Sequence, residues 1–239
     1  SGALRHAAER DHAAGGGDGR RGPAQAGSLA HHGRQGIAEG AEMLVDGRDF
    51  DGSQAGADCA KFQMRNMASM YRNTGGNAAD PSEDLGAQYT LDLLSRFQLS
   101  EDELIQAFDH CKLCGMEPLC TPWDLESLAT LEAYGMQAYK LASADLSNHD
   151  LLEAMAKTGK LIIASTGMSN EAEIRAAVKL LQRNNANYVL LHCNSTYPAP
   201  FKDVNLNYLD RLAEIGACPV GYSGHERGVH VPIAAVAKG

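Results

Sequence analysis

The sequence predicts an α/β protein of the (β/α)8 TIM-barrel class, in which parallel strands alternate with helices. Short segments that are apolar on both faces recur between helical patterns, as is typical of strands buried in a parallel sheet. Each of these segments ends in polar side chains, as the strands of a parallel barrel do at the mouth that carries the active site. A Gly-rich phosphate turn, common after the first strand of an open doubly wound sheet, does not follow residues 57–63.

Length and composition favour one barrel domain. With 239 residues, of which 44% are hydrophobic, the chain can bury one sizeable core. The net charge of -9 argues against nucleic acid or an anionic membrane as the main partner, although local lysines still allow an anionic substrate. No apolar run approaches the ~20 residues of a membrane helix, and no signal peptide is visible. We therefore expect a cytoplasmic protein whose six cysteines are reduced.

The first 36 residues differ from the rest of the chain. They are rich in Ala, Gly, Arg and His and lack aliphatic periodicity, a composition that favours disorder. The barrel domain is therefore assigned to residues 37–239. A helix is expected at 37–46, followed by a polar stretch at 47–54.

From residue 57 onward, strands and helices are expected to alternate, which implies parallel βαβ units. The strands are expected at 57–63, 115–122, 138–143, 161–166, 188–191 and 219–222. The helices are expected at 100–114, 125–134, 149–157, 169–183, 206–215 and 231–237. Ser100 and Glu103 have the spacing of a capping box, and Ser169 or Asn170 is expected to cap the fourth helix. Eight strands would need one before residue 57 and one after residue 239, so the barrel is expected to be incomplete at its C-terminal end and atypical at its N-terminus.

Polar side chains at the strand ends are expected to converge on one mouth. Lys61 and Lys140 stand among hydroxyl and amide donors, a combination that suits a ligand carrying both a phosphate and a carboxylate. Asp145 either faces this site or caps the helix that follows it. His192 is expected to have a structural role, and Trp123 to be a packing residue. The full set at the strand ends is Lys61, Gln63, Thr121, Lys140, Ser143, Asp145, Ser165, His192, Asn194, Ser195, Ser223 and His225.

Several motifs in this order resemble the N-acetylneuraminate (sialic acid) synthase family. The similarity is continuous from about residue 56 to residue 239, and the order of several motifs makes it specific. The motifs are KFQ (61–63), LGAQYTLDLLSRFQLS (85–100), YKLASADLSNHDLL (139–152), ASTGMSNEAEI (164–174), LLHCNSTYPAP (190–200) and VGYSGHERG (220–228).

The resemblance implies a barrel that condenses phosphoenolpyruvate with an N-acetylated hexosamine to give a nine-carbon keto acid and phosphate. It implies a divalent metal, manganese or else magnesium, with His225 as one ligand, and a homodimer when the protein is complete. Asp145, Gln63 and Tyr197 would face the sugar, with Asp145 in a catalytic role. The residues implied to hold phosphoenolpyruvate are Lys61, Thr121, Lys140, Ser143, Ser165, Ser195 and Ser223.

The chain also departs from the family pattern. Gln25 stands where the family has a catalytic Glu, and an amide cannot exchange a proton at neutral pH. The family's second metal-binding histidine and its C-terminal antifreeze-like domain would follow Gly239. The alternatives are therefore a barrel that binds sugar or phosphoenolpyruvate without turnover, or another phosphoenolpyruvate-dependent keto-deoxy-sugar acid synthase. Sialic, legionaminic and related acids share these motifs, so the acceptor hexosamine stays open.

Overall fold

The computed structural model describes residues 56–67, 94 and 98–239. The chain divides into two units, Ser1–Arg34 and Gln35–Gly239, and all described residues lie in the second unit. Gln25, the helix expected at 37–46 and most of the connection after residue 64 lie outside the described residues. The domain assignment made from the sequence therefore stays a prediction.

The described part of the chain contains a six-stranded parallel sheet whose strand order follows the sequence. All six predicted strands are confirmed, with ends shifted by one or two residues in most cases. The strands are β1 (Cys59–Met64), β2 (Glu117–Pro122), β3 (Ala138–Leu141), β4 (Leu161–Ser165), β5 (Tyr188–Cys193) and β6 (Val220–Ser223).

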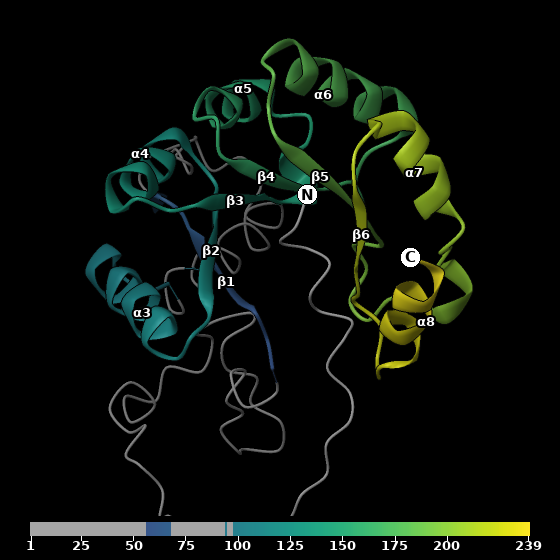
Figure 1. Ribbon diagram of the computed structural model, residues 1–239, viewed down its shortest axis with the longest axis horizontal. Helices are drawn as coiled ribbons and strands as arrows, with labels where there is room; N and C mark the ends of the chain where they lie inside the picture. The colour runs from purple at the N-terminus through teal and green to yellow at the C-terminus, as the bar shows by residue number, and fades with distance from the viewer. Residues whose placement is uncertain (1–55, 68–93, 95–97) are drawn as a thin grey trace, which may run out of the picture. The chain divides into compact units, whose positions relative to one another are not determined.

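A helix follows each of the last five strands, and α3 connects β1 to β2. Figure 1 shows α3 to α7 along the outer side of the curved sheet. Helices on one side of a sheet in sequential order are typical of a parallel barrel, whereas a doubly wound sheet reverses its strand order and carries helices on both faces. The predicted α/β barrel class is therefore confirmed. The helices are α3 (Glu101–Leu113), α4 (Leu125–Tyr134), α5 (His149–Lys157), α6 (Glu171–Arg183), α7 (Tyr208–Gly216) and α8 (His230–Lys238), with short 3-10 turns η3 (Ser143–Asp145) and η4 (Phe201–Asp203).

Local capping interactions determine where several helices begin. The predicted capping box of α3 is present, because Ser100 Oγ accepts the Glu103 N–H while Glu103 Oε2 accepts the Ser100 N–H. Asn170, rather than Ser169, caps α6 in the same way with Glu173. The expectation that Asp145 caps α5 is wrong: Asn148 is three residues nearer, and its side chain accepts the N–H of Leu151.

The core lies between the sheet and the helices that cover it. Phe62 of β1 meets Phe108 of α3 in an edge-to-face contact with ring centroids 5.2 Å apart. Tyr139, Ile162 and Leu190 continue the same buried layer along the later strands. All six cysteines are free, as expected, and no helix among the described residues is long and apolar enough to cross a membrane.

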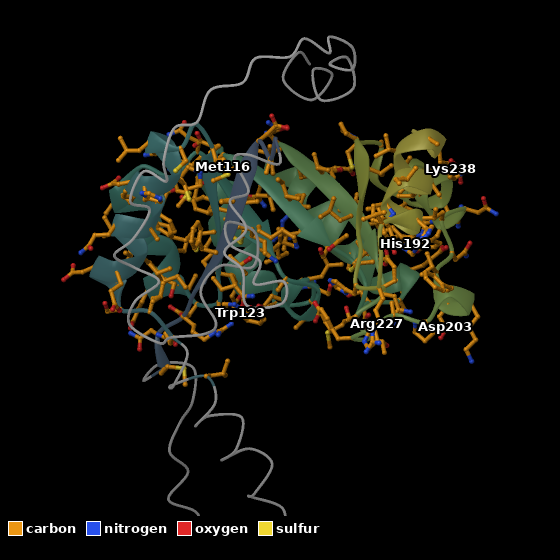
Figure 2. The ribbon with its side chains drawn as sticks, turned by 90° about the horizontal axis from the view of Figure 1, so that it is seen from below. Met116, Trp123, His192, Asp203, Arg227 and Lys238 are labelled. Atoms are coloured by element: carbon orange, nitrogen blue, oxygen red, sulfur yellow. The ribbon has the colours of Figure 1, made fainter. Side chains whose placement is uncertain are left out.

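The carboxyl ends of the strands lie along one edge of the sheet. Trp123, Asp203 and Arg227 follow β2, β5 and β6, and Figure 2 shows all three at this edge, with Met116, which precedes β2, at the opposite one. Parallel pairing has this effect because every strand runs in the same direction. The polar residues at the strand ends are thereby gathered on one side of the molecule.

Two leucines of α3 test how far burial contributes to stability. Leu104 is 4% exposed and Leu113 is 86% exposed. We expect Leu104→Ala to lower the free energy of unfolding by about 2–5 kcal/mol, because it leaves a cavity beneath the helix. The matched control Leu113→Ala should change it by less than about 0.5 kcal/mol. Urea denaturation measures both, and equal effects of the two substitutions would contradict the packing described here.

Gly167 tests the close approach between the ends of β4 and β5. A Cβ at this position would lie 2.5 Å from Cys193 Sγ and 2.7 Å from the Cys193 carbonyl oxygen, so the backbone itself would have to move. We expect Gly167→Ala to destabilise the fold by about 1–3 kcal/mol in urea denaturation. Gly221→Ala is the control: its Cβ would meet only the end of the Leu191 side chain, which can rotate away. A control as unstable as Gly167→Ala would show that backbone contact is not the cause.

Candidate active site

Every predicted site residue except Gln25 is described, and apart from Lys61, which is in the middle of β1, each lies near or after the carboxyl end of a strand. Lys61 and Gln63 are on β1, where Gln63 pairs with Thr121 of β2. Lys140 is on β3, with Ser143 and Asp145 in the following turn η3, and Ser165 ends β4. Ser223 ends β6. Ser195 and Tyr197 come after β5 and His225 after β6, so the residues share one edge but form separate contact groups.

The first group surrounds the ammonium of Lys140. This side chain is only 7% exposed, and its Nζ donates to Ser165 Oγ at 2.6 Å and to the Leu141 carbonyl at 2.7 Å. Thr121 and Ser165 are each 3% exposed. Ser165 Oγ and the Leu141 carbonyl are uncharged acceptors, and an anion within reach stabilises a buried cation further. A buried ammonium beside hydroxyl groups is chemically suited to an anionic ligand, and the binding role expected from the sequence stays a prediction.

The second group joins the ends of β3, β4 and β5. Ser143 Oγ lies 3.3 Å from Cys193 Sγ, and Gly167 leaves space for Cys193 and Ser195 to approach. The hydroxyl groups of Ser143, after β3, and Ser195, after β5, thus both lie near Cys193 at the end of β5. Such groups can donate hydrogen bonds to phosphate or carboxylate oxygens.

The third group centres on His225. Its Nδ1 lies 2.6 Å from the carbonyl oxygen of Asn194, and its Nε2 lies 3.0 Å from the Tyr197 hydroxyl. A carbonyl only accepts, so Nδ1 carries the hydrogen and the neutral ring has its lone pair on Nε2. Tyr197 also stacks on the imidazole, with ring centroids 4.1 Å apart. The Ala199 N–H donates to the His225 carbonyl, which ties the loops after β5 and β6 together.

This tautomer suits a histidine that binds a divalent metal through Nε2, because metal-binding histidines usually donate their other N–H to a carbonyl or carboxylate. Among the described residues, no group of three or more His, Cys, Asp or Glu side chains is arranged to hold a metal ion, at His225 or elsewhere. The described residues therefore fit one metal ligand and do not assemble a complete set.

Asp145 has a half-buried carboxyl group in η3. Its Oδ1 accepts a hydrogen bond from Asn148 Nδ2 at 3.2 Å, whereas Oδ2 is buried and has no hydrogen-bond partner among the described residues. Burial raises the pKa of Asp145, and the bond from Asn148 opposes that rise. The carboxyl can thus retain a proton at a higher pH than an ordinary aspartate.

His192 packs as the sequence predicted. Its ring lies 5.5 Å from that of Tyr208 and 6.0 Å from that of Tyr222, measured between centroids. Burial lowers the pKa of His192, which favours the neutral imidazole. The residue supports the end of β5 by packing against its neighbours.

Trp123 and Arg65 are the residues that sequence reasoning missed. Trp123 was expected only to pack, but its indole N–H donates to Gln63 Oε1 at 2.9 Å. Arg65 donates to the same oxygen at 2.5 Å. Their positions immediately after β1 and β2 were the available signal, because those segments lie side by side in a parallel sheet.

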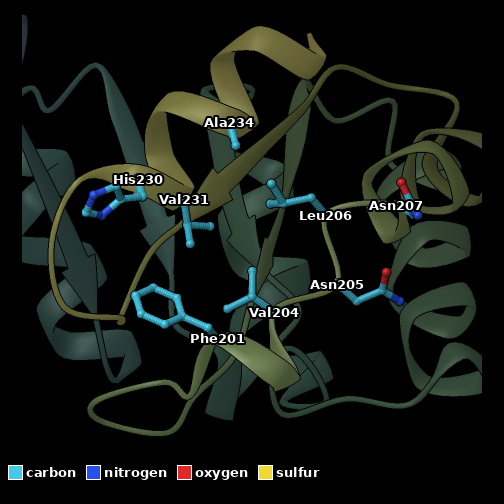
Figure 3. A pocket seen from close by; sticks show the side chains of 8 residues that line it. All are labelled: Phe201, Val204, Asn205, Leu206, Asn207, His230, Val231 and Ala234. Atoms are coloured by element: carbon cyan, nitrogen blue, oxygen red, sulfur yellow. The ribbon is translucent and has the colours of Figure 1, made fainter.

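A pocket of about 360 Å³ lies apart from all predicted site residues. Its lining residues come from η4 and the segment after it and from the start of α8: Phe201, Val204, Asn205, Leu206, Asn207, His230, Val231 and Ala234. Figure 3 shows Phe201, Val204 and Val231 pointing toward one another inside it. Its lining is mainly apolar and contains no Lys or Arg.

A model of the NeuB family matches residues 51–239. The chain is 36% identical over 191 residues to the N,N'-diacetyllegionaminic acid synthase of Campylobacter jejuni, a match that covers 78% of this chain and 57% of that protein. It is 28% identical over 207 residues to the N-acetylneuraminate-9-phosphate synthase of Drosophila melanogaster, covering 86% of this chain and 55% of that protein.

Among solved structures, the fold is similar to the N-acetylneuraminic acid synthetase of Leptospira borgpetersenii in complex with citrate. The TM-score is 0.69 at 29% identity, over 78% of this chain and 61% of that one. The chain thus spans less than two thirds of the length of each of these relatives. The resemblance inferred from the motifs is confirmed, and the chain belongs to the NeuB family.

Proposed function

We propose that this barrel contributes to the condensation of phosphoenolpyruvate with an N-acetylated hexosamine. The product is a keto sugar acid of nine carbons, such as N-acetylneuraminate, and phosphate is released. The observation that carries the proposal is the buried Lys140 ammonium, bonded to Ser165 at the carboxyl edge of the sheet. Family membership and the names of the relatives support the same reaction.

Phosphoenolpyruvate would bind through the lysines and hydroxyl groups at the strand ends. Lys61 and Lys140 supply positive charge for its phosphate and carboxylate. Thr121, Ser143, Ser165, Ser195 and Ser223 supply hydrogen-bond donors around them. Because Lys140 is held on β3 and by Ser165 on β4, it is already oriented before the ligand arrives, which reduces the entropy lost on binding.

Gln63, Tyr197 and Asp145 would face the hexosamine. The reaction joins the enol carbon of phosphoenolpyruvate to the aldehyde carbon of the open-chain sugar, so the aldehyde oxygen gains a proton and water replaces the departing phosphate. Asp145 suits proton transfer, because burial raises its pKa toward the pH at which enzymes work. Gln25 cannot serve this purpose, since an amide does not ionise near neutral pH and cannot act as an acid or a base.

We also propose a divalent metal, Mn²⁺ or Mg²⁺, with His225 Nε2 as one ligand. Such an ion polarises an aldehyde oxygen and stabilises the negative charge that develops on it. The Asn194 carbonyl holds the imidazole in the tautomer that this role needs. A homodimer and a cytoplasmic location stay predictions from the sequence.

A barrel that binds these ligands without turnover is the second candidate. The resemblance to the family favours it, because Gln25 is the nearest match in the sequence to the family's catalytic Glu. The two candidates agree on the binding residues and differ in whether phosphate is released.

The first experiment follows phosphate release from phosphoenolpyruvate. We expect this chain, or a longer chain that contains it, to release phosphate only when Mn²⁺ and N-acetylmannosamine or a related hexosamine are both present. Lys140→Met should weaken phosphoenolpyruvate binding by about tenfold or more, because it removes a buried charged donor. Lys157→Met, at an exposed lysine of α5, is the matched control.

Each result of this experiment separates the candidates. Tight phosphoenolpyruvate binding without release for any hexosamine would favour the binding-only barrel. Normal binding by Lys140→Met would overturn the site assignment. Release that is indifferent to a chelator would rule out the metal.

Asp145→Asn tests the raised pKa of the carboxyl group. The folded protein binds this proton more tightly than the unfolded chain, for which the ordinary value is 3.8. Ionisation of Asp145 therefore destabilises the fold as pH rises through the raised pKa, and has no effect well below 3.8. We expect Asp145→Asn to be more stable than the wild type at neutral pH, with the difference disappearing on acidification.

Urea denaturation across this pH range measures the difference between Asp145→Asn and the wild type. Asp203→Asn, at an exposed aspartate in η4, controls for the general effect of removing a carboxylate. A difference that stays constant with pH would contradict a raised pKa at Asp145.

A further inference from the structure

Gln63 is held by two donors that come from different segments. The indole Nε1 of Trp123 lies 2.9 Å from Gln63 Oε1, and Nη2 of Arg65 lies 2.5 Å from the same oxygen. The Arg65 guanidinium also stacks on the indole, with its carbon 4.9 Å from the ring centroid. We call Trp123 and Arg65 the Gln63 clamp.

The clamp is itself fixed by the backbone. The Trp123 N–H donates to the Met64 carbonyl at 3.0 Å, which extends the β1–β2 pairing beyond the strands. The Arg65 carbonyl accepts a hydrogen bond from Gln98 Nε2 at 2.7 Å. Both clamp residues therefore have little freedom to leave Gln63.

The clamp determines which way the Gln63 amide points. An amide has one end that accepts hydrogen bonds and one end that donates them. Both clamp residues only donate toward Gln63, so turning the amide over would bring N–H groups against N–H groups and break two hydrogen bonds. The carbonyl oxygen consequently faces the clamp, and the NH₂ group is directed away from it.

We propose that Trp123 and Arg65 are positioning residues of the sugar site, which hold Gln63 so that its NH₂ group donates to an oxygen of the acceptor hexosamine. The oxygen is a hydroxyl or the acetamido carbonyl, since both accept hydrogen bonds. The inference rests on the proposed function, and it specifies that the Gln63 NH₂ group donates to the sugar from a fixed direction. A site built in this way favours a sugar that carries a hydrogen-bond acceptor in the direction that the clamp fixes, because only such a sugar gains this hydrogen bond.

Binding of a sugar that cannot react tests the clamp without any need for turnover. N-acetylmannosaminitol, the open-chain alditol, keeps the hydroxyl and acetamido groups but lacks the aldehyde. We expect Trp123→Phe and Arg65→Met to weaken its binding by about five- to tenfold in calorimetry, with phosphoenolpyruvate and Mn²⁺ present. Phosphoenolpyruvate affinity should change by less than about twofold, because the hydrogen bonds given above for the clamp go to Gln63, Met64 and Gln98 and not to Lys140 or Ser165.

Two further variants complete the experiment. Tyr134→Phe is the control, because it also removes a hydrogen-bond donor from an aromatic side chain. The Tyr134 hydroxyl donates to Asp109 on the helical side of the molecule, so this variant should bind both ligands like the wild type. Gln63→Glu retains an acceptor for the clamp but has no NH₂ group, so it should lose alditol affinity even if Trp123→Phe does not fold. Trp123 is the single tryptophan of the chain, and its fluorescence in the wild type should change when the alditol binds.

A selective loss of alditol affinity supports the clamp. Unchanged alditol affinity in both clamp variants would overturn the proposal. An equal loss of affinity for the alditol and for phosphoenolpyruvate would also overturn it, because it would indicate a general structural role. These outcomes are distinct from a failure of the proposed function. In that case the wild type itself would bind no phosphoenolpyruvate or no alditol, and the inference would fall with the proposal.

Discussion

The parallel pairing of consecutive strands is the constraint on which the candidate site depends. β1 pairs with β2 over six residues, and each later strand joins the next in the same direction. Side chains that are separated by more than 150 residues in the sequence, such as Gln63 and His225, therefore lie along the same edge of the sheet. The helices on the outer side hold this arrangement by burying the apolar faces of the strands.

Burial at this edge has opposite effects on the ionisable groups that it encloses. It raises the pKa of Asp145 and lowers that of His192, because a poorly hydrated environment disfavours the charged form of each. Lys140 is buried as well, beside Ser165 and the Leu141 carbonyl. Burial thus favours the neutral forms of Asp145 and His192, whereas the ammonium of Lys140 is held by hydrogen bonds to Ser165 and Leu141.

Hydrogen bonds between loops add the finer orientation that the strands alone do not provide. The Asn194 carbonyl selects the tautomer of His225, and Trp123 and Arg65 select the direction of the Gln63 amide. In both cases a group that can only accept or only donate a hydrogen bond determines the orientation of a side chain that can do both. Rigid orientation of this kind is what binding and catalytic sites require of the residues around them.

The sequence by itself determined the alternation of strands and helices, the capping box at Ser100 and the polar strand ends. These signals are local: they depend on periodicity and on residues three or four positions apart. Tertiary structure decided that Asn148, not Asp145, caps α5, and that Trp123 bonds Gln63 instead of only packing. The indole N–H and the amide oxygen come from residues 60 positions apart, and their contact depends on the register of two paired strands and the path of the chain beyond them. No spacing within the sequence encodes that register, because it is set by the packing of the whole sheet against its helices.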